Sequence, residues 1–223
     1  MIIAFSGNKF AGKDTAAEAL IRSYGFKRIG LADKLKDICS EVFEISRKDM
    51  DNPDLKEKQF SIPISINPTH IDSLLTTLQR DGYVFDYDAK YETIFKSFQG
   101  KNLKSIRDML QVVGTDICRT YIKDDLWLTY IQNFIKTFDG SVVITDARFK
   151  NERDYLKNLG AILILVKRPG LENTSSHISE NQLGDDSEYD VVITNDDSIT
   201  CLQSSVNMWF SVKQHAIKSN FKR

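Results

Sequence analysis

The chain has 223 residues, of which 41% are apolar, and its 30 basic side chains nearly balance its 31 acidic ones. This balance gives no bulk field for nucleic acid or an anionic membrane, and no apolar run approaches the ~20 residues of a membrane span, so we expect neither as a partner. The length suits one domain with an insertion, and three widely spaced cysteines fit a reducing cytoplasm as small core residues. Any basic side chains that bind an anionic ligand must therefore do so within a local site.

The N-terminus is an apolar run, Met1–Ser6, that leads directly into a glycine-rich loop, Gly7–Thr15. No basic segment precedes this run, which predicts a buried strand and not a signal peptide. Gly7, Gly12 and Lys13 have the spacing of the phosphate-binding G-x-x-x-x-G-K-[ST] loop, where backbone N–H groups, a helix N-terminus and a lysine hold a phosphate chain. The alternative is a simple strand–turn–helix with an exposed lysine. The apolar strand before the loop and the helix-forming residues after it favour phosphate binding.

Between this loop and residue 100, regular strand and helix patterns give way to a polar, proline-containing region. Residues 26–31 form a short strand pattern, and the apolar spacing over 32–43 predicts a helix. Residues 46–100 hold three of the four prolines and many polar residues, without a parallel-strand pattern. We expect this region to be an insertion at the rim of a core formed by residues 1–45 and 101–223.

From residue 103 onward, helical patterns alternate with strand patterns. Residues 142–145 and 161–166 are continuous apolar runs, as in parallel strands that are buried on both faces, and 189–193 is the last strand pattern. This alternation predicts an α/β fold, with a parallel sheet of about five strands joined by right-handed crossovers.

Asp146 and Arg148 follow the predicted strand 142–145. The carboxyl ends of parallel strands share one edge of the sheet with the phosphate loop. An acid there can hold Mg²⁺ against phosphates, and an arginine two residues on can reach a transferring phosphoryl group. The alternative is that Asp146 caps the helix near Asn151 and Arg148 forms a surface ion pair. The glycine-rich loop favours the functional interpretation.

A further polar group lies on the helix near residue 110. Arg107 and Gln111 are four residues apart and share a helix face, and Gly114-Thr115-Asp116 should break or bend that helix. Arg107 can grip a monophosphate with two N–H groups, and Gln111 and Asp116 can contact a base or a ribose. Taken alone, the segment is better explained as a helix with a solvated arginine and a glycine cap.

Polar positions also follow the strands at 161–166 and 189–193. Arg168 ends the first of these strands, and His177 and Glu180 lie in the polar stretch after it, so we expect a mobile lid over about 168–188 that excludes water. The alternative for His177 is an exposed loop histidine. Asn195 can contact the edge of adenine, or it can form an Asx turn before the last helix.

Together these segments resemble the phage deoxynucleoside monophosphate kinases of the P-loop nucleoside and nucleotide kinase superfamily. The resemblance covers nearly the whole chain except about 50–100, and it depends on the order and spacing of the segments. They are G-N-K-F-A-G-K-D-T at 7–15, L-A-D-K-L-K-D at 31–37, R-x-x-L-Q-x-x-G-T-D at 107–116, T-D-A-R at 145–148, L-G-A-I-L-I-L-V-K-R-P-G at 159–170, H-I-S-E at 177–180 and D-V-V-I-T-N-D at 190–196.

The resemblance implies a three-layer P-loop kinase fold and transfer of the γ-phosphoryl group of ATP to a deoxynucleoside monophosphate, with Mg²⁺ as cofactor. It also implies a mostly helical acceptor-binding lobe within 46–100 and action in the host cytoplasm, and it makes a homodimer plausible. Asp14 stands where Ser or Thr is usual, but this family accepts Asp there. Asp14 and Asp146 are then expected to hold Mg²⁺, directly or through water.

The implied site residues fall into four groups. The catalytic group is Lys13, Asp146, Arg148 and Arg168; the ATP-binding group is Gly7, Asn8, Ala11, Gly12, Lys13, Asp14, Thr15 and Asn195; the acceptor-binding group is Lys36, Arg107, Gln111, Gly114, Thr115, Asp116 and Arg148; and the lid group is Arg168, His177 and Glu180.

Two other classes of function stay open at this point. One is a different small-molecule P-loop kinase, of the dephospho-CoA or phosphomevalonate type. The other is a regulatory module that binds ATP without turnover, and its signature would be ATP binding without acceptor-dependent release of ADP.

Overall fold

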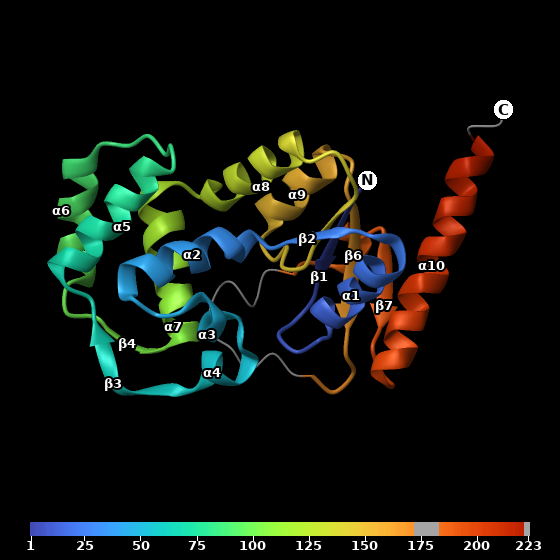
Figure 1. Cartoon of the computed structure of the whole chain (residues 1–223), viewed down its shortest axis with the longest axis horizontal. Coiled ribbons are helices and arrows are strands. Elements are labelled where there is room, and N and C mark those ends of the chain that lie inside the picture. Colours follow the sequence, from blue (N-terminus) through green and yellow to red (C-terminus); the bar gives the residue numbers. More distant parts are fainter. Residues whose placement is uncertain (172–182, 221–223) are drawn as a thin grey trace. The chain divides into compact units, whose positions relative to one another are not determined.

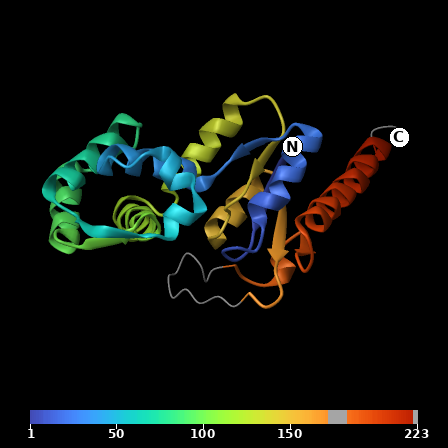
Figure 2. The same ribbon diagram turned by 60° about the horizontal axis from the view of Figure 1, so that its bottom comes forward.

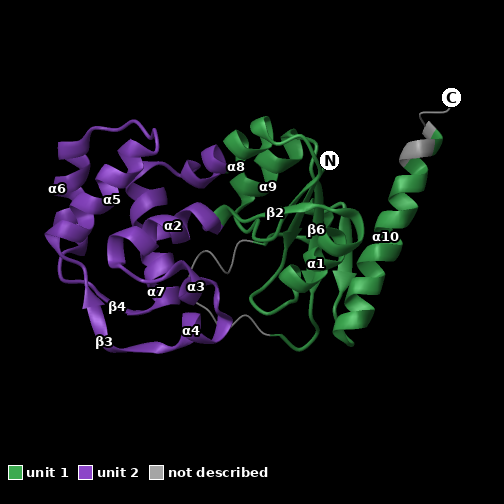
Figure 3. Ribbon diagram, viewed as in Figure 1, with its two compact units in different colours: residues 1–31, 131–223 green, residues 32–130 purple. Residues whose placement is uncertain are grey.

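The structure, a computed structural model, describes residues 1–171 and 183–220. It divides into two compact units, of which the first comprises Met1–Leu31 and Ile131–Arg223 and the second Ala32–Tyr130 (Figure 3). The predicted insertion, 46–100, lies inside the second unit, whose bounds are wider at both ends.

The first unit is built on a parallel sheet of five strands, which confirms the predicted α/β fold (Figure 1). The strand order is β2-β5-β1-β6-β7, and every neighbouring pair is parallel. The first strand in the chain is therefore central, with later strands on both sides of it. The strands are β1 Ile2–Ser6, β2 Lys27–Ile29, β5 Val142–Ile144, β6 Ile162–Lys167 and β7 Val191–Thr194.

Helices cover both faces of this sheet. The sheet lies between α9 (Lys150–Asn158) on one side and α1 (Lys13–Tyr24) and α10 (Ile199–Asn220) on the other (Figure 2). Alternate strand residues such as Ile3 and Phe5 join α1 and α10 in one buried apolar cluster. Buried apolar area of this kind contributes about 25 cal/mol per Å², so this cluster holds α1 and α10 against the sheet.

The second unit is mostly helical and has a small antiparallel sheet of its own. Its helices bury an apolar core in which Leu75, Leu78 and Ile94 have no exposed surface. Its elements are α2 Leu31–Phe43, α3 Arg47–Asp51, α4 Pro53–Glu57, β3 Gln59–Ser65, α5 Pro68–Arg80, α6 Tyr87–Phe98, β4 Asn102–Ser105, α7 Ile106–Gln111 and the π-helix η1 Val112–Ile122; α8, Leu126–Thr137, leads back to the first unit.

The segment at Gly114 differs from the sequence prediction. The chain does not break there, because α7 continues directly into the π-helix η1, where the winding changes. The carbonyl of Gly114 accepts a hydrogen bond of 3.1 Å from the indole N–H of Trp127. A Cβ atom at Gly114 would lie 2.4 Å from a methyl carbon of Leu35. The missing Cβ atom at Gly114 therefore leaves room for the Leu35 side chain, and Gly114 does not cap a helix.

The cysteine prediction is also corrected in part. Cys39 and Cys118 are buried, and burial raises the pKa of both thiols above the ordinary value. Cys201 is exposed on α10, so it is not a core residue. In the described part of the chain, no helix is both long enough and apolar enough to cross a membrane.

Candidate functional site

The glycine-rich loop connects β1 to α1 and depends on two glycines. Gly7 and Gly12 have φ angles of 145° and 100°, which side-chain-bearing residues rarely adopt. A Cβ atom at Gly7 would lie 2.4 Å from the carbonyl oxygen of Val166 in β6. The backbone of the loop therefore packs directly onto the neighbouring strand. This close approach explains why a glycine stands at position 7.

Lys13 begins α1 and is 8% exposed. Its ammonium group donates a hydrogen bond of 2.8 Å to the carbonyl oxygen of Asn8, across the loop. The amide of Ala11 also donates to this carbonyl, at 3.1 Å. A full positive charge is thus held beside a helix N-terminus, which is the arrangement that favours a phosphate chain.

Asn195 follows β7 and lies against the same loop. Its side-chain amide donates a hydrogen bond of 2.9 Å to the carbonyl oxygen of Ala11. A Cβ atom at Gly12 would lie 2.6 Å from this amide nitrogen. Asn195 therefore fixes the loop itself, while the following helix is capped by Ser198, whose hydroxyl accepts the amide of Cys201 at 3.2 Å. The predicted contact of Asn195 with adenine stays a prediction.

Asp14 and Thr15 occupy the first turn of α1. The Asp14 side chain is 79% exposed, and one of its carboxylate oxygens lies 3.9 Å from the guanidinium of Arg28. Thr15 is half-buried, and its backbone carbonyl accepts a hydrogen bond of 3.3 Å from the side chain of Gln203 in α10. The Asp14 carboxylate is thus accessible at the helix N-terminus.

Asp146 lies two residues after the end of β5, in the sequence motif T-D-A-R, and is half-buried. One of its carboxylate oxygens accepts the backbone N–H of Leu31 at 2.7 Å, at the start of α2. Helix α9 begins after Phe149, so the alternative that Asp146 caps this helix is wrong. The hydroxyl of Ser6 donates to the carbonyl of Ala147, which ties this segment to the end of β1.

Two arginines of the predicted catalytic group lie in the first unit. Arg148 is half-buried, and its backbone N–H donates to the carboxylate of Glu152 at 2.9 Å. Arg168 follows β6, and its guanidinium lies 3.5 Å from the carbonyl oxygen of Phe10 in the loop. The predicted lid residues His177 and Glu180 lie outside the described residues.

The acceptor-side candidates lie in the second unit, where carboxylates accompany the cations. Lys36 is 7% exposed, and its ammonium lies 2.8 Å from an Asp51 oxygen. Arg107 donates to Glu57 at 2.7 Å, and the Asp116 carboxylate lies 3.6 Å from Lys101. The remaining acceptor candidates are half-buried Gln111 and Thr115 and buried Gly114.

Arg47, which the sequence did not single out, joins Lys36 in this network. Its guanidinium pairs with Asp51, with Asp37 at 2.8 Å and with Asp33 at 3.2 Å. Partial burial acts to raise the pKa of Asp51. The hydrogen bond and charge of Lys36, followed by those of Arg47, outweigh burial and hold this pKa below its ordinary value. The Asp51 carboxylate is therefore ionised at neutral pH.

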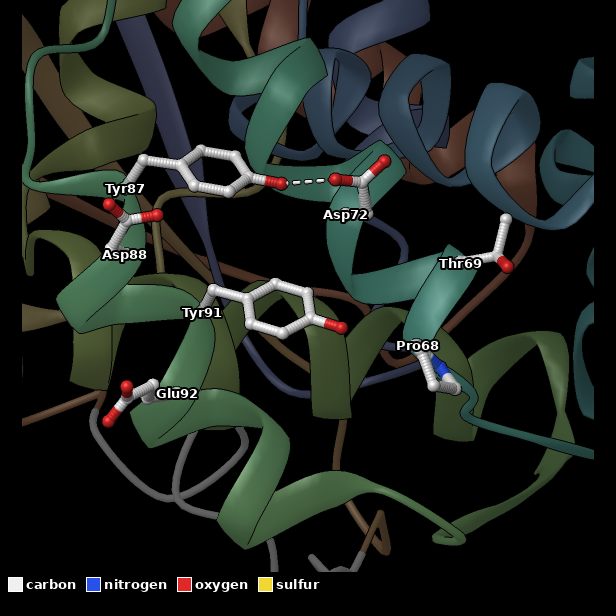
Figure 4. A pocket seen from close by; sticks show the side chains of 7 residues that line it. All are labelled: Pro68, Thr69, Asp72, Tyr87, Asp88, Tyr91 and Glu92. Carbon is white, nitrogen blue, oxygen red and sulfur yellow. Dashed lines mark hydrogen bonds between the residues drawn. The ribbon is translucent and has the colours of Figure 1, made fainter.

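A pocket of about 800 Å³ lies between α5 and α6 of the second unit (Figure 4). The Tyr87 hydroxyl donates to Asp72 across its mouth. Three carboxylates would repel the phosphate of an acceptor, so this pocket is not a phosphate site. Its lining is Pro68, Thr69, Asp72, Tyr87, Asp88, Tyr91 and Glu92.

Comparison with known proteins identifies the family. The sequence pattern described as "deoxynucleotide monophosphate kinase" matches residues 1–67 and 65–206. The chain belongs to this family. It is 30% identical to a putative deoxynucleotide monophosphate kinase of Acanthamoeba polyphaga mimivirus, over 92% of this chain and 94% of the relative.

Two phage relatives are similar over the same extent. The deoxynucleotide monophosphate kinase of Enterobacteria phage T4 is 27% identical over 92% of this chain and 96% of its own. That of Escherichia phage RB69 is 30% identical over 92% of this chain and 97% of its own. Membership in the deoxynucleotide monophosphate kinase family makes this protein a kinase, which confirms the enzyme class predicted from the sequence.

The donor groups around the loop of this kinase fit Mg²⁺ that is held largely by nucleotide phosphates. Among residues 1–171 and 183–220, no group of three or more His, Cys, Asp or Glu side chains can hold a metal ion. Mg²⁺ commonly uses only one or two carboxylates together with water and substrate phosphates. The exposed Asp14 carboxylate and the half-buried Asp146 carboxylate are of that chemistry.

Sequence reasoning missed several residues that shape this site. Ser6 fixes the T-D-A-R segment, while Glu152 and Arg153 hold the backbone of Arg148. A signal for Glu152 was present, because it stands three residues after Phe149 at the start of a helix, where an acidic side chain commonly caps N–H groups. No such local signal marks the contacts of Arg153.

Proposed function

We propose that this protein transfers the γ-phosphoryl group of ATP to deoxynucleoside monophosphates, giving deoxynucleoside diphosphates for DNA synthesis. The observation that carries the proposal is the loop between β1 and α1, with Lys13 at a helix N-terminus and held across the loop at 2.8 Å from the Asn8 carbonyl. The names of the phage and mimivirus relatives support the choice of acceptor.

On the donor side, the β- and γ-phosphates of ATP lie over Gly7–Thr15. Lys13 exchanges the Asn8 carbonyl for phosphate oxygens, and Asn195 keeps Ala11 and Gly12 in place during this exchange. Asp14 and Asp146 hold Mg²⁺, directly or through water. When bound, the ion neutralises phosphate charge and orients the outer phosphates.

The reaction needs little acid–base help from the protein. The second pKa of a monophosphate is about 6, so the acceptor is already largely dianionic at neutral pH. One of its oxygens forms a bond to the γ-phosphorus while the bond to the β-phosphate oxygen breaks and ADP leaves. Arg148 and Arg168 neutralise the charge of the transferring group, which is the main requirement of phosphoryl transfer.

On the acceptor side, Arg107 binds the monophosphate with its planar guanidinium, and Lys36 adds charge. Gln111 and Asp116 contact the deoxynucleoside, with Gly114 and Thr115 forming the adjoining backbone. Because Arg107 donates to Glu57 at 2.7 Å, the acceptor phosphate takes the place of this carboxylate. The carboxylate network of Lys36 opens in the same manner.

The decisive experiment is a coupled assay of ADP release with each of the four deoxynucleoside monophosphates and their ribose counterparts. The proposal expects ADP release that depends on a deoxynucleoside monophosphate and stops when Mg²⁺ is removed by EDTA. ATP binding without acceptor-dependent ADP release contradicts it and indicates a regulatory module. Turnover with dephospho-CoA or phosphomevalonate alone indicates a different kinase.

Three further expectations extend the proposal. The family resemblance makes a homodimer plausible, and sedimentation equilibrium of the full chain measures the oligomeric state. The lid predicted from Arg168, His177 and Glu180 stays a prediction, because His177 and Glu180 lie outside the described residues. The enzyme acts in the cytoplasm, where nucleotide pools are held.

A further inference from the structure

Two neighbouring charged residues near the start of α9 are almost completely buried. Glu152 is 4% exposed and Arg153 is 2% exposed. Charged side chains are rarely buried to this degree unless they are paired and hydrogen-bonded, because removal from water is costly. Their partners therefore show what this burial achieves.

Glu152 holds two successive backbone N–H groups. One of its carboxylate oxygens accepts the N–H of Arg148 at 2.9 Å and the N–H of Phe149 at 3.0 Å. Because the Glu152 side chain is almost completely buried, its position is restricted. The N–H of Arg148 is thus fixed by a buried side-chain acceptor.

Arg153 holds the other side of the same residue. Its guanidinium donates to the carbonyl oxygen of Arg148 at 2.8 Å and to a carboxylate oxygen of Glu188 at 2.7 Å. It also lies over the ring of Tyr189, with the guanidinium carbon 5.5 Å from the ring centre. The hydrogen bond from Arg153 lowers the pKa of Glu188, so this carboxylate stays ionised at neutral pH.

Residues 146–149 are consequently fixed at each position. Asp146 accepts the N–H of Leu31, the carbonyl of Ala147 accepts the Ser6 hydroxyl, and the backbone of Arg148 is held at both of its polar groups. A helix cap alone would require the Glu152 bonds but not the Arg153 bond. We call these hydrogen bonds to residues 146–149 the clamp. Ser6 directly precedes Gly7, so the clamp is connected to the phosphate loop through the chain.

We propose that Glu152 and Arg153 are positioning residues that set the backbone of Arg148, and so aim its guanidinium at the transferring phosphoryl group. This inference rests on the proposed function, in which Arg148 neutralises the negative charge of the phosphoryl group during transfer. A displacement of ~1 Å in a reacting group can lower the rate by about 10². Fixing both polar groups of one peptide residue prevents such a displacement.

Arg153→Lys is the sharpest test, because one ammonium group cannot reproduce the two-sided geometry of a guanidinium. We expect kcat to fall by about ten- to a hundred-fold, with the KM values for ATP and the monophosphate changed less than about threefold. In an Arg148→Ala background, the same substitution should lower kcat no further, while its effect on the melting temperature should persist. An equal fall of kcat in both backgrounds would overturn the proposal.

Matched controls lie on the same helix. Lys150 and Asp154 form an exposed ion pair of 2.7 Å on α9, so Lys150→Ala and Asp154→Ala should leave kcat and KM unchanged. Glu188→Gln keeps an acceptor for Arg153 and should retain more activity than Arg153→Lys. If Lys150→Ala lowered kcat as much as Arg153→Lys, the effect would belong to α9 as a whole and the positioning role would fail.

A readout without turnover separates this inference from the proposed function. Hydrogen exchange of the Arg148 and Phe149 amides should be at least tenfold faster in Glu152→Ala than in the wild type, and intermediate in Glu152→Gln. Unchanged amide exchange rates in Glu152→Ala would show that Glu152 does not fix the Arg148 backbone, even where kinase activity is normal. If exchange is faster in Glu152→Ala but the wild-type protein has no kinase activity, the clamp is supported and only the proposed function is rejected.

Discussion

The basic side chains proposed to bind the two substrates have different partners in the two units. In the first unit, Lys13 and Arg168 approach backbone carbonyls of the loop, whereas in the second unit Lys36 and Arg107 pair with carboxylates. A phosphate replaces a neutral carbonyl more readily than it replaces a charged carboxylate, because the carboxylate competes for the same donors. In the proposed function, the donor site is therefore preset for phosphate, whereas the acceptor site must exchange an anion.

Removal of the Lys13 charge should give the largest effect. Lys13→Ala should lower kcat by about 10²–10⁴, as expected for the loss of a preorganised charge. Steady-state ADP release measures this change, and Lys213→Ala, at an exposed position of α10, is the control. Normal turnover of Lys13→Ala would show that the loop is not the donor site.

The second-largest effect distinguishes the strain of a left-handed backbone from the loss of packing in the phosphate loop. Gly12 and Gly25 flank α1 with φ angles of 100° and 72°, but only Gly12 has a neighbour, Asn195, within 4 Å of an added Cβ atom. Both alanine variants should lose about 1–2 kcal/mol of stability from the left-handed conformation. Only Gly12→Ala should also raise the KM for ATP, by about tenfold on the scale of one lost charge-assisted contact.

Thermal melts and initial rates test this pair together. Equal KM values for ATP in the two glycine variants would contradict the role of Asn195 in fixing the loop.

The third effect tests anion exchange in the second unit. Arg107→Ala should raise the KM for the monophosphate by about ten- to a hundred-fold, the range for a lost hydrogen bond to a charged group. Glu57→Gln should lower that KM, because Arg107 loses its competing carboxylate at 2.7 Å. Initial rates at varied monophosphate concentration measure both. An effect of Arg107→Ala that is confined to ATP would place this residue on the donor side.

The smallest effect concerns pH and the network around Asp51. The pKa of this carboxyl is lowered in the folded state by Lys36 and Arg47, although partial burial opposes them. Its contribution to stability is therefore complete above the unfolded pKa near 4 and is lost as pH falls through the lowered folded pKa. Urea unfolding should show Asp51→Asn less stable than the wild type at pH 7, with the difference shrinking toward pH 2. A constant difference would contradict the ionised network.

The sequence predicts the sheet because its signals are local. The apolar runs at β5 and β6 are continuous, and parallel strands buried on both faces require this. The loop from Gly7 to Lys13 is likewise a short pattern with a physical reason for each glycine. Such features need no knowledge of distant residues.

Other features depend on contacts that are distant in sequence and so could not be predicted. Gly114 resembles a helix cap, but its role is set by Leu35, and Arg107 finds Glu57 fifty residues earlier in the chain. Glu152 and Arg153 belong to a charged stretch, K-N-E-R-D, that resembles an exposed helix surface. Their burial follows from the T-D-A-R backbone beside them, which a pattern of hydrophobicity does not reveal.

The central position of β1 has a consequence for synthesis of the chain. Ile2 and Ile3 are made long before their partners, Val142 in β5 and Ile162 in β6. Pairing over such separations is slow, and domains emerge from the ribosome with their N-terminal residues first. The apolar strand β1 must therefore wait, unpaired, until the segments that form β5 and β6 have been translated.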